Sequence, residues 1–210
     1  MSEPSDLAHV VWIGGSPCAG KSSVAQLLVA QHRLRLYQSD PLESRPATDA
    51  QPTKRYLQSL SPDELWLRPV PVQTATELDY CREEFAQVVA DLRLLPRFDT
   101  VLAEGTALLP QAVVPLLTRP NQAVWMVPTP EFQRHHYPRR GNWPHEVVAG
   151  TSDPAQGFAN WMERDVRYAR IVAATARELD QLVIEVDGRR SVAELAAVIA
   201  QHLGLGRPPS

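Results

Sequence analysis

Five short runs rich in apolar and β-branched residues recur along the chain, and segments with helical spacing separate them. The runs are HVVWI (9–13), RLYQ (35–38), TVLAE (100–104), AVWMV (123–127) and LVIEV (182–186). They are nearly continuous in hydrophobicity rather than alternating, which is typical of strands covered on both faces. Strands that alternate with helices predict an α/β fold, with a five-stranded parallel sheet between layers of helices.

Polar residues mark where several helices begin. Ser61, Thr129 and Asp153 are each followed by a proline, which is the sequence of an N-cap and a first helical residue. Ser191 with Glu194 forms a capping box. These signals predict helices that start at about residues 62, 130, 154 and 192.

One long segment departs from the alternation. Residues 41–98 contain helical patterns but no convincing strand, and they lie between the second and third apolar runs. A helical excursion there would sit above the carboxyl ends of the strands, where α/β sheets bind ligands. We expect one domain over residues 1–210 that includes this excursion.

Composition narrows the class of protein. The 210 residues are 44% hydrophobic and carry a net charge of -3, which favours neither a nucleic-acid nor a membrane partner. Cys18 and Cys81 give no disulfide framework, no signal peptide is evident, and no apolar run approaches ~20 residues. We therefore expect a cytoplasmic protein, with its oligomeric state left open.

The segment GSPCAGKS (15–22) fits the phosphate-binding P-loop pattern G-x-x-x-x-G-K-[ST] between a strand and a helix. Gly15 and Gly20 let successive backbone N–H groups turn toward phosphate oxygens, and the following helix directs its positive end there. Lys21 would neutralise the β- and γ-phosphates, and Ser22 would ligate Mg²⁺. The predicted nucleotide-binding residues of this loop are Gly15, Ser16, Pro17, Cys18, Ala19, Gly20, Lys21, Ser22 and Ser23.

The guanine-reading motif N-K-x-D is absent, and the third apolar run ends in Glu104 rather than Asp. The whole pattern resembles the P-loop nucleoside, nucleotide and small-metabolite kinases, which include adenylate, shikimate and gluconate kinases and chloramphenicol phosphotransferase. WIGGSPCAGKSS (12–23), LAEGTALLP (102–110) and NWMERDVRYA (160–169) look like a bacterial kinase-like group of unassigned substrate. The resemblance implies ATP, Mg²⁺ and transfer of the γ-phosphate to a hydroxyl of a small molecule. A nucleotide-binding regulator without transfer activity is the alternative.

The resemblance also implies roles for two carboxylates. Asp40 follows the second strand, where such kinases place the acidic residue that contacts the acceptor hydroxyl. Its alternative role is to cap a helix that begins at Pro41. Glu104 would either hold a Mg²⁺-bound water or replace Asp40 as base, unless it is only a solvated strand end.

Arginines supply the remaining candidates. In the lid segment expected at about 129–153, Arg134 and Arg139 would stabilise the transferring phosphoryl group and Arg140 would contact the nucleotide, unless this is a polar surface loop. Other candidates fall into three groups: a row of arginines on one helix that would face the phosphates, a pair of arginines of which one would stack on the base, and a set of residues on the acceptor side. They are Arg164, Arg167 and Arg170 for the row, Arg189 or Arg190 for the base, and Trp66, Arg68, Tyr80 and Arg82 for the acceptor side.

Overall fold

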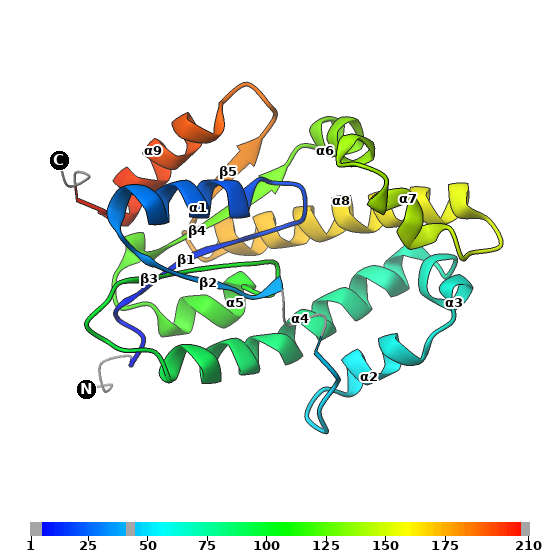
Figure 1. Cartoon of the computed structure of the whole chain (residues 1–210), viewed down its shortest axis with the longest axis horizontal. Helices are drawn as coiled ribbons and strands as arrows, with labels where there is room; N and C mark the ends of the chain where they lie inside the picture. Colours follow the sequence, from blue (N-terminus) through cyan, green and yellow to red (C-terminus); the bar gives the residue numbers. More distant parts are fainter. Residues whose placement is uncertain (1–5, 41–44, 207–210) are drawn as a thin grey trace.

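The computed structural model describes residues 6–40 and 45–206, and it confirms the predicted fold class. Five parallel strands form one sheet in the order β2-β3-β1-β4-β5, with helices on both faces (Figure 1). The strands are β1 Val10–Gly15, β2 Arg35–Gln38, β3 Val101–Glu104, β4 Ala123–Pro128 and β5 Leu182–Val186.

The helices and 3₁₀ turns lie between these strands. They are α1 Lys21–His32, α2 Pro52–Ser59, α3 Pro62–Trp66, α4 Val70–Arg93, α5 Pro110–Val113, η2 Val114–Leu116, η3 Pro120–Gln122, α6 Pro130–His136, η4 Tyr137–Arg139, α7 Trp143–Val148, α8 Pro154–Glu178 and α9 Val192–Leu203. None of the described helices is long and apolar enough to cross a membrane.

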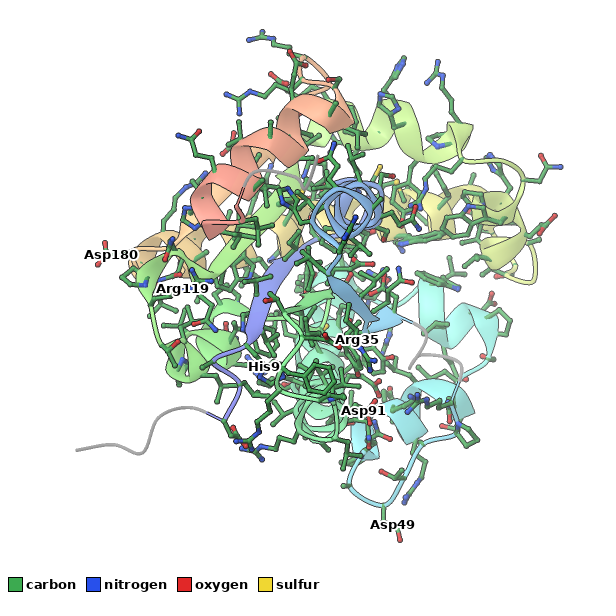
Figure 2. The ribbon with its side chains drawn as sticks, turned by 60° about the vertical axis from the view of Figure 1, so that its left-hand side comes forward. His9, Arg35, Asp49, Asp91, Arg119 and Asp180 are labelled. Atoms are coloured by element: carbon green, nitrogen blue, oxygen red, sulfur yellow. The ribbon has the colours of Figure 1, made fainter. Side chains whose placement is uncertain are left out.

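Two apolar cores hold the layers together. On one face of the sheet α1 and α9 pack over Ile13, Leu102 and Val124, and on the other α4 and α8 pack over Trp12 and Trp125. The three central strands are buried along their whole length. The expectation of burial on both faces is wrong for the two edge strands, β2 and β5, which are partly exposed (Figure 2 labels the first residue of β2, Arg35).

The predicted helix starts are confirmed in atomic detail. The side chains of Ser61, Thr129, Asp153 and Ser191 each accept a hydrogen bond from a backbone N–H in the first turn of the helix that follows. Both serines complete a capping box. At each of these four helices, the residue before the first turn therefore supplies an acceptor for a backbone N–H group that has no partner within the helix.

The helical excursion forms the lower right of Figure 1, where α2, α3 and the first half of α4 lie beyond the sheet. No strand occurs in its described part, residues 45–98, as predicted. The proposed helix start at Pro41 lies outside the described residues. Segment 129–153 contains α6, η4 and α7, and both α6 and α7 lie along α8 (Figure 1).

Candidate active site

The loop between β1 and α1 has the backbone that a phosphate cradle needs. Gly15 has φ 133°, and a Cβ there would lie 1.9 Å from the carbonyl oxygen of Met126. Cys18 and Gly20 also have positive φ, at 65° and 77°. These turns curl the chain so that α1 begins immediately behind the loop, with its N–H groups directed into the concave side.

Lys21 is buried at the first position of α1, with 5% of its surface exposed. Its Nζ donates to the carbonyl oxygen of Ser16 at 2.9 Å, and it forms no ion pair with any carboxylate in the described part of the chain. The Ser16 hydroxyl beside it is buried and has no partner among the same residues. A desolvated ammonium without a counter-ion at a helix N-terminus suits an anionic ligand such as a polyphosphate.

One cavity of about 750 Å³ opens in front of this loop. P-loop residues 17–23 line one end, and α2, α3 and α4 line the other. The lid segment and α8 complete its walls with Phe132, His136, Tyr137, Arg140, Trp143, Val147, Trp161 and Arg164. The cavity volume is within the range of small-molecule binding sites.

Asp40 lies in this cavity together with Thr106. The backbone N–H of Thr106 donates to Asp40 Oδ1 at 3.2 Å, so the loop after β3 holds the carboxylate that follows β2. Gly105 has φ 152°, and a Cβ there would lie 1.7 Å from Ser39 Oγ. The glycine therefore permits the close approach that places Asp40.

Gly105→Ala is expected to lower the free energy of unfolding by about 2–3 kcal/mol, because the new methyl group meets Ser39 at a strained backbone position. Urea denaturation followed by circular dichroism measures this loss. Gly206→Ala is the control, since a Cβ at Gly206 meets nothing within 4 Å. Equal stability of the two variants would contradict the assigned role of Gly105.

Tyr168 of α8 forms a hydrogen bond with the same loop. Its hydroxyl donates to the carbonyl oxygen of Thr106 at 2.7 Å and lies 3.4 Å from Cys81 Sγ. Burial raises the pKa of Tyr168 well above its usual value, so the hydroxyl keeps its proton and remains a donor. A hydrogen-bonded path thus runs from α8 through Thr106 to Asp40.

Tyr168→Phe is expected to cost about 1–2 kcal/mol of stability, because it leaves the carbonyl of Thr106 without this buried donor. Thermal unfolding of the variant tests the loss, with Tyr56→Phe as the control at a half-exposed ring. A Tyr168→Phe protein as stable as the parent would show that the Thr106 contact contributes nothing.

Glu104 ends β3 and is fully buried, which rules out the alternative of a solvated strand end. It pairs in register with Ile13, and paired residues of parallel strands share a face, so its side chain lies on the α1 side of the sheet. Oε1 accepts from Gln38 Nε2 at 2.8 Å, and Oε2 has no partner in the described chain. Glu104 does not line the cavity, in contrast to Asp40.

A buried charge network lies on the acceptor side. Arg164 of α8 contacts Glu77 of α4 at 3.3 Å and Asp165 at 2.8 Å. Burial raises the pKa of Glu77, and Arg164 opposes that shift. The pKa of Arg164 is itself raised, because Asp165 and Glu77 outweigh the effect of burial, so this guanidinium stays charged. Of the three arginines predicted on α8, only Arg164 lines the cavity, and Arg167 and Arg170 are exposed.

In the lid segment, Arg140 is the arginine that lines the cavity. It lies over the rings of Tyr137 at 5.5 Å and Trp143 at 5.3 Å, which position the guanidinium. Arg134 instead pairs with Glu163 at 3.2 Å, and Arg139 donates to the carbonyl of His135. Neither of the two predicted catalytic arginines lines the cavity in this structure.

Two further candidates lie at the surface. Arg189 pairs with Asp187 at 3.3 Å and is exposed, while Arg82 pairs with Asp79. Neither lines the cavity, whereas Trp66, Arg68 and Tyr80 do. Near the β5–α9 loop the cavity is lined by Phe132, whose ring would lie 3.0 Å from a Cβ at Gly188. Two histidines of the lid segment contact aromatic rings: the His136 ring lies 4.0 Å from that of Phe132, and His145 stacks on Phe158.

Sequence reasoning named Tyr80 but missed the other polar residues on this side of α4, which are Gln73, Glu77 and Glu84. Gln73, Glu77, Tyr80 and Glu84 recur at i, i+4, i+7 and i+11, and all four line the main cavity or the small crevice beside it. This spacing places polar groups on the stripe of a helix that normally carries its apolar core contacts. The pattern was therefore a readable signal of a site.

Comparisons with known proteins give the following findings. No protein-family model and no curated protein matches the chain. Among solved structures it is similar to shikimate kinase from Aquifex aeolicus, with 16% identity, a TM-score of 0.47 and coverage of 93% of this chain and 96% of that one. It is also similar to shikimate kinase from Acinetobacter baumannii in complex with shikimate, with 17% identity, a TM-score of 0.46 and coverage of 91% of this chain and 90% of that one. A third similar structure is an uncharacterized protein from Eubacterium ventriosum, with 12% identity, a TM-score of 0.43 and coverage of 93% of this chain and 97% of that one. At these identities and TM-scores, the similarity carries no information on the reaction or the acceptor.

Proposed function

We propose that the protein transfers the γ-phosphoryl group of Mg·ATP to a hydroxyl group of a small-molecule acceptor. The observation that carries this proposal is that one cavity has a phosphate-binding loop at one end and Asp40 with the helices of the excursion at the other. A site that served only to bind nucleotide would need no second polar compartment beside the phosphates.

The backbone of residues 15–22 and Lys21 would hold the β- and γ-phosphates, and Arg140 would bind the outer phosphate oxygens from the lid. Ser22 lines the cavity and is the candidate Mg²⁺ ligand, whereas Glu104 is fully buried outside the cavity and is given no role at the ion. The metal would neutralise charge on the phosphates.

Asp40 is the candidate base, since it lies in the cavity and Glu104 does not. Its carboxylate would accept the proton as the acceptor oxygen bonds to phosphorus and the bond from phosphorus to the bridging oxygen of ADP breaks. The backbone N–H of Thr106 keeps one carboxylate oxygen occupied and leaves the other for the hydroxyl.

The test uses a metabolite extract with γ-¹⁸O-labelled Mg·ATP and mass spectrometry. We expect a labelled phosphometabolite with the wild-type protein that is absent with the Lys21→Met variant. Binding of ATP with no labelled product would contradict phosphotransfer to a small molecule and favour the regulatory alternative.

A further inference from the structure

Arg68 lies in the short turn between α3 and α4, at the acceptor end of the cavity. The turn is fixed from two sides. Gln73 Nε2 donates to the carbonyl oxygens of Arg68 at 2.8 Å and Trp66 at 3.1 Å, and Asn160 of α8 donates to the latter at 3.0 Å. The backbone that carries Arg68 is therefore held in place before any ligand binds.

Two of the three nitrogens of the Arg68 guanidinium lack, among the described residues, the hydrogen-bond acceptors that buried N–H groups require. Its Nε and Nη1 are shielded from solvent and have no hydrogen-bond partner in the described chain, where no carboxylate forms an ion pair with it. The ring of Tyr56 lies 5.7 Å from the guanidinium carbon, and the charge of Arg68 also acts on the Glu77 carboxyl, whose pKa it lowers against the larger effect of burial. Buried N–H groups of a cation that lack an oxygen acceptor are costly, so the site is complete only when something supplies one.

The other cations of the cavity are already committed. Lys54 pairs with Glu84 at 2.9 Å, and Arg164 pairs with Glu77 and Asp165. Lys21 and Arg140 lie on the P-loop and the lid, where the triphosphate would bind. Arg68 thus remains as a cation for the acceptor itself.

A second unmet group lies on the same wall. Gln73 is 2% exposed, lines the cavity, and its Oε1 has no partner among the described residues. Its Nε2 is held by two carbonyls, so the amide orientation is fixed and Oε1 can only accept. A ligand that satisfies this wall must bring an anionic group for Arg68 and a hydrogen-bond donor, such as a hydroxyl, for Gln73.

We propose that the acceptor is a hydroxylated anion whose carboxylate or phosphate group binds Arg68. This inference rests on the proposed phosphotransfer. It adds that the molecule carries its negative charge at the α3–α4 end of the cavity, while a hydroxyl reaches Asp40. Neutral sugars and cationic amino alcohols are excluded as good acceptors, because they would leave the guanidinium unpaired.

The experiment separates a metabolite extract on an anion-exchange resin into bound and unbound fractions. Each fraction is supplied at limiting concentration with γ-¹⁸O-labelled Mg·ATP, and the rate of label transfer is measured. We expect transfer with the resin-bound fraction alone. Treating that fraction with alkaline phosphatase distinguishes the two anions, since it destroys a phosphate-ester acceptor and spares a carboxylate.

Variants assign the effect to Arg68. Arg68→Gln should lower the transfer rate roughly 100-fold while the Kd for Mg·AMP-PNP stays within about twofold of wild type. Arg68→Lys keeps the charge without the paired N–H geometry and should lose less. Arg177→Gln is the matched control at an exposed arginine of α8, and should change neither quantity. Unaltered Mg·AMP-PNP binding shows that each variant is folded.

Three results would overturn the inference. Label transfer to the unbound fraction would refute the anionic acceptor and leave phosphotransfer intact. A loss of Mg·AMP-PNP affinity in Arg68→Gln, with circular dichroism unchanged, would assign the side chain to the nucleotide. Absence of transfer from every fraction with wild type would refute the proposed function, and this inference with it.

Discussion

Lys21→Met is expected to reduce phosphotransfer by roughly 10³-fold or more while leaving the fold at least as stable as the parent. The lysine places its charge inside the P-loop, where it would oppose the negative charge that develops on the phosphoryl oxygens. Methionine has a similar volume and no charge, so it removes the electrostatic contribution and fills the same space. The rate of label transfer from γ-¹⁸O-labelled Mg·ATP measures the loss.

Stability should not follow activity in this variant. Lys21 is 5% exposed and has no carboxylate partner in the described chain, so the folded state bears the desolvation of an unpaired ammonium. Its bond to the carbonyl of Ser16 recovers part of that cost. Replacing the group by an apolar one should leave the free energy of unfolding unchanged or raise it by up to about 1 kcal/mol.

A thermal shift with nucleotide provides the control for this prediction. Mg·AMP-PNP should raise the Tm of wild type, because it binds the folded state, and should raise that of Lys21→Met little or not at all. Full transfer activity in Lys21→Met would refute the proposed function. A variant that unfolds would instead contradict the view that the lysine is kept for function at the expense of stability.

The element order and the phosphate loop could be predicted because their signals are local. The apolar runs, the four N-caps and the motif around Gly15, Gly20 and Lys21 each depend on residues within one turn or strand. The pairing of β2 with β3 in the sheet then brings Asp40 and the loop after Glu104 to the same edge, where the strands end.

The acceptor side could not be assigned in the same way, because its contacts join distant parts of the chain. Arg164 meets Glu77 across 87 positions, and only the packing of α8 on α4 decides which of three similarly spaced arginines does so. In the lid segment, Arg140 follows the turn η4 and lines the cavity, whereas Arg134 of α6 pairs with Glu163 at the surface. Sequence spacing identifies candidate residues on a helix, but which of them faces the cavity depends on how the helix is rotated when it packs.

The two lysines of the chain allow a direct contrast between function and stability. Lys54→Met is expected to lower the free energy of unfolding by about 3–5 kcal/mol, the opposite of the result for Lys21→Met. Lys54 is 3% exposed, and its Nζ lies 2.9 Å from Oε1 of Glu84, which is 2% exposed. Removing the ammonium leaves a carboxylate in the interior with Gln51 as its donor, at 2.5 Å. Urea denaturation measures the change, and a loss of this size would lower the Tm by roughly 10 °C.

The double variant Lys54→Met with Glu84→Met shows whether the pair, rather than either side chain, accounts for the loss. Each single substitution removes one member of the ion pair, whereas the double substitution removes both. We therefore expect the double variant to lose clearly less than the sum of the two single losses, with a coupling of about 2 kcal/mol or more. Additive losses would mean that α2 is held on α4 by contacts independent of this ion pair. The difference in stability between Lys54→Met and Lys21→Met would then come from packing, because the loss at Lys54 would no longer be caused by a buried carboxylate that has lost its ion pair.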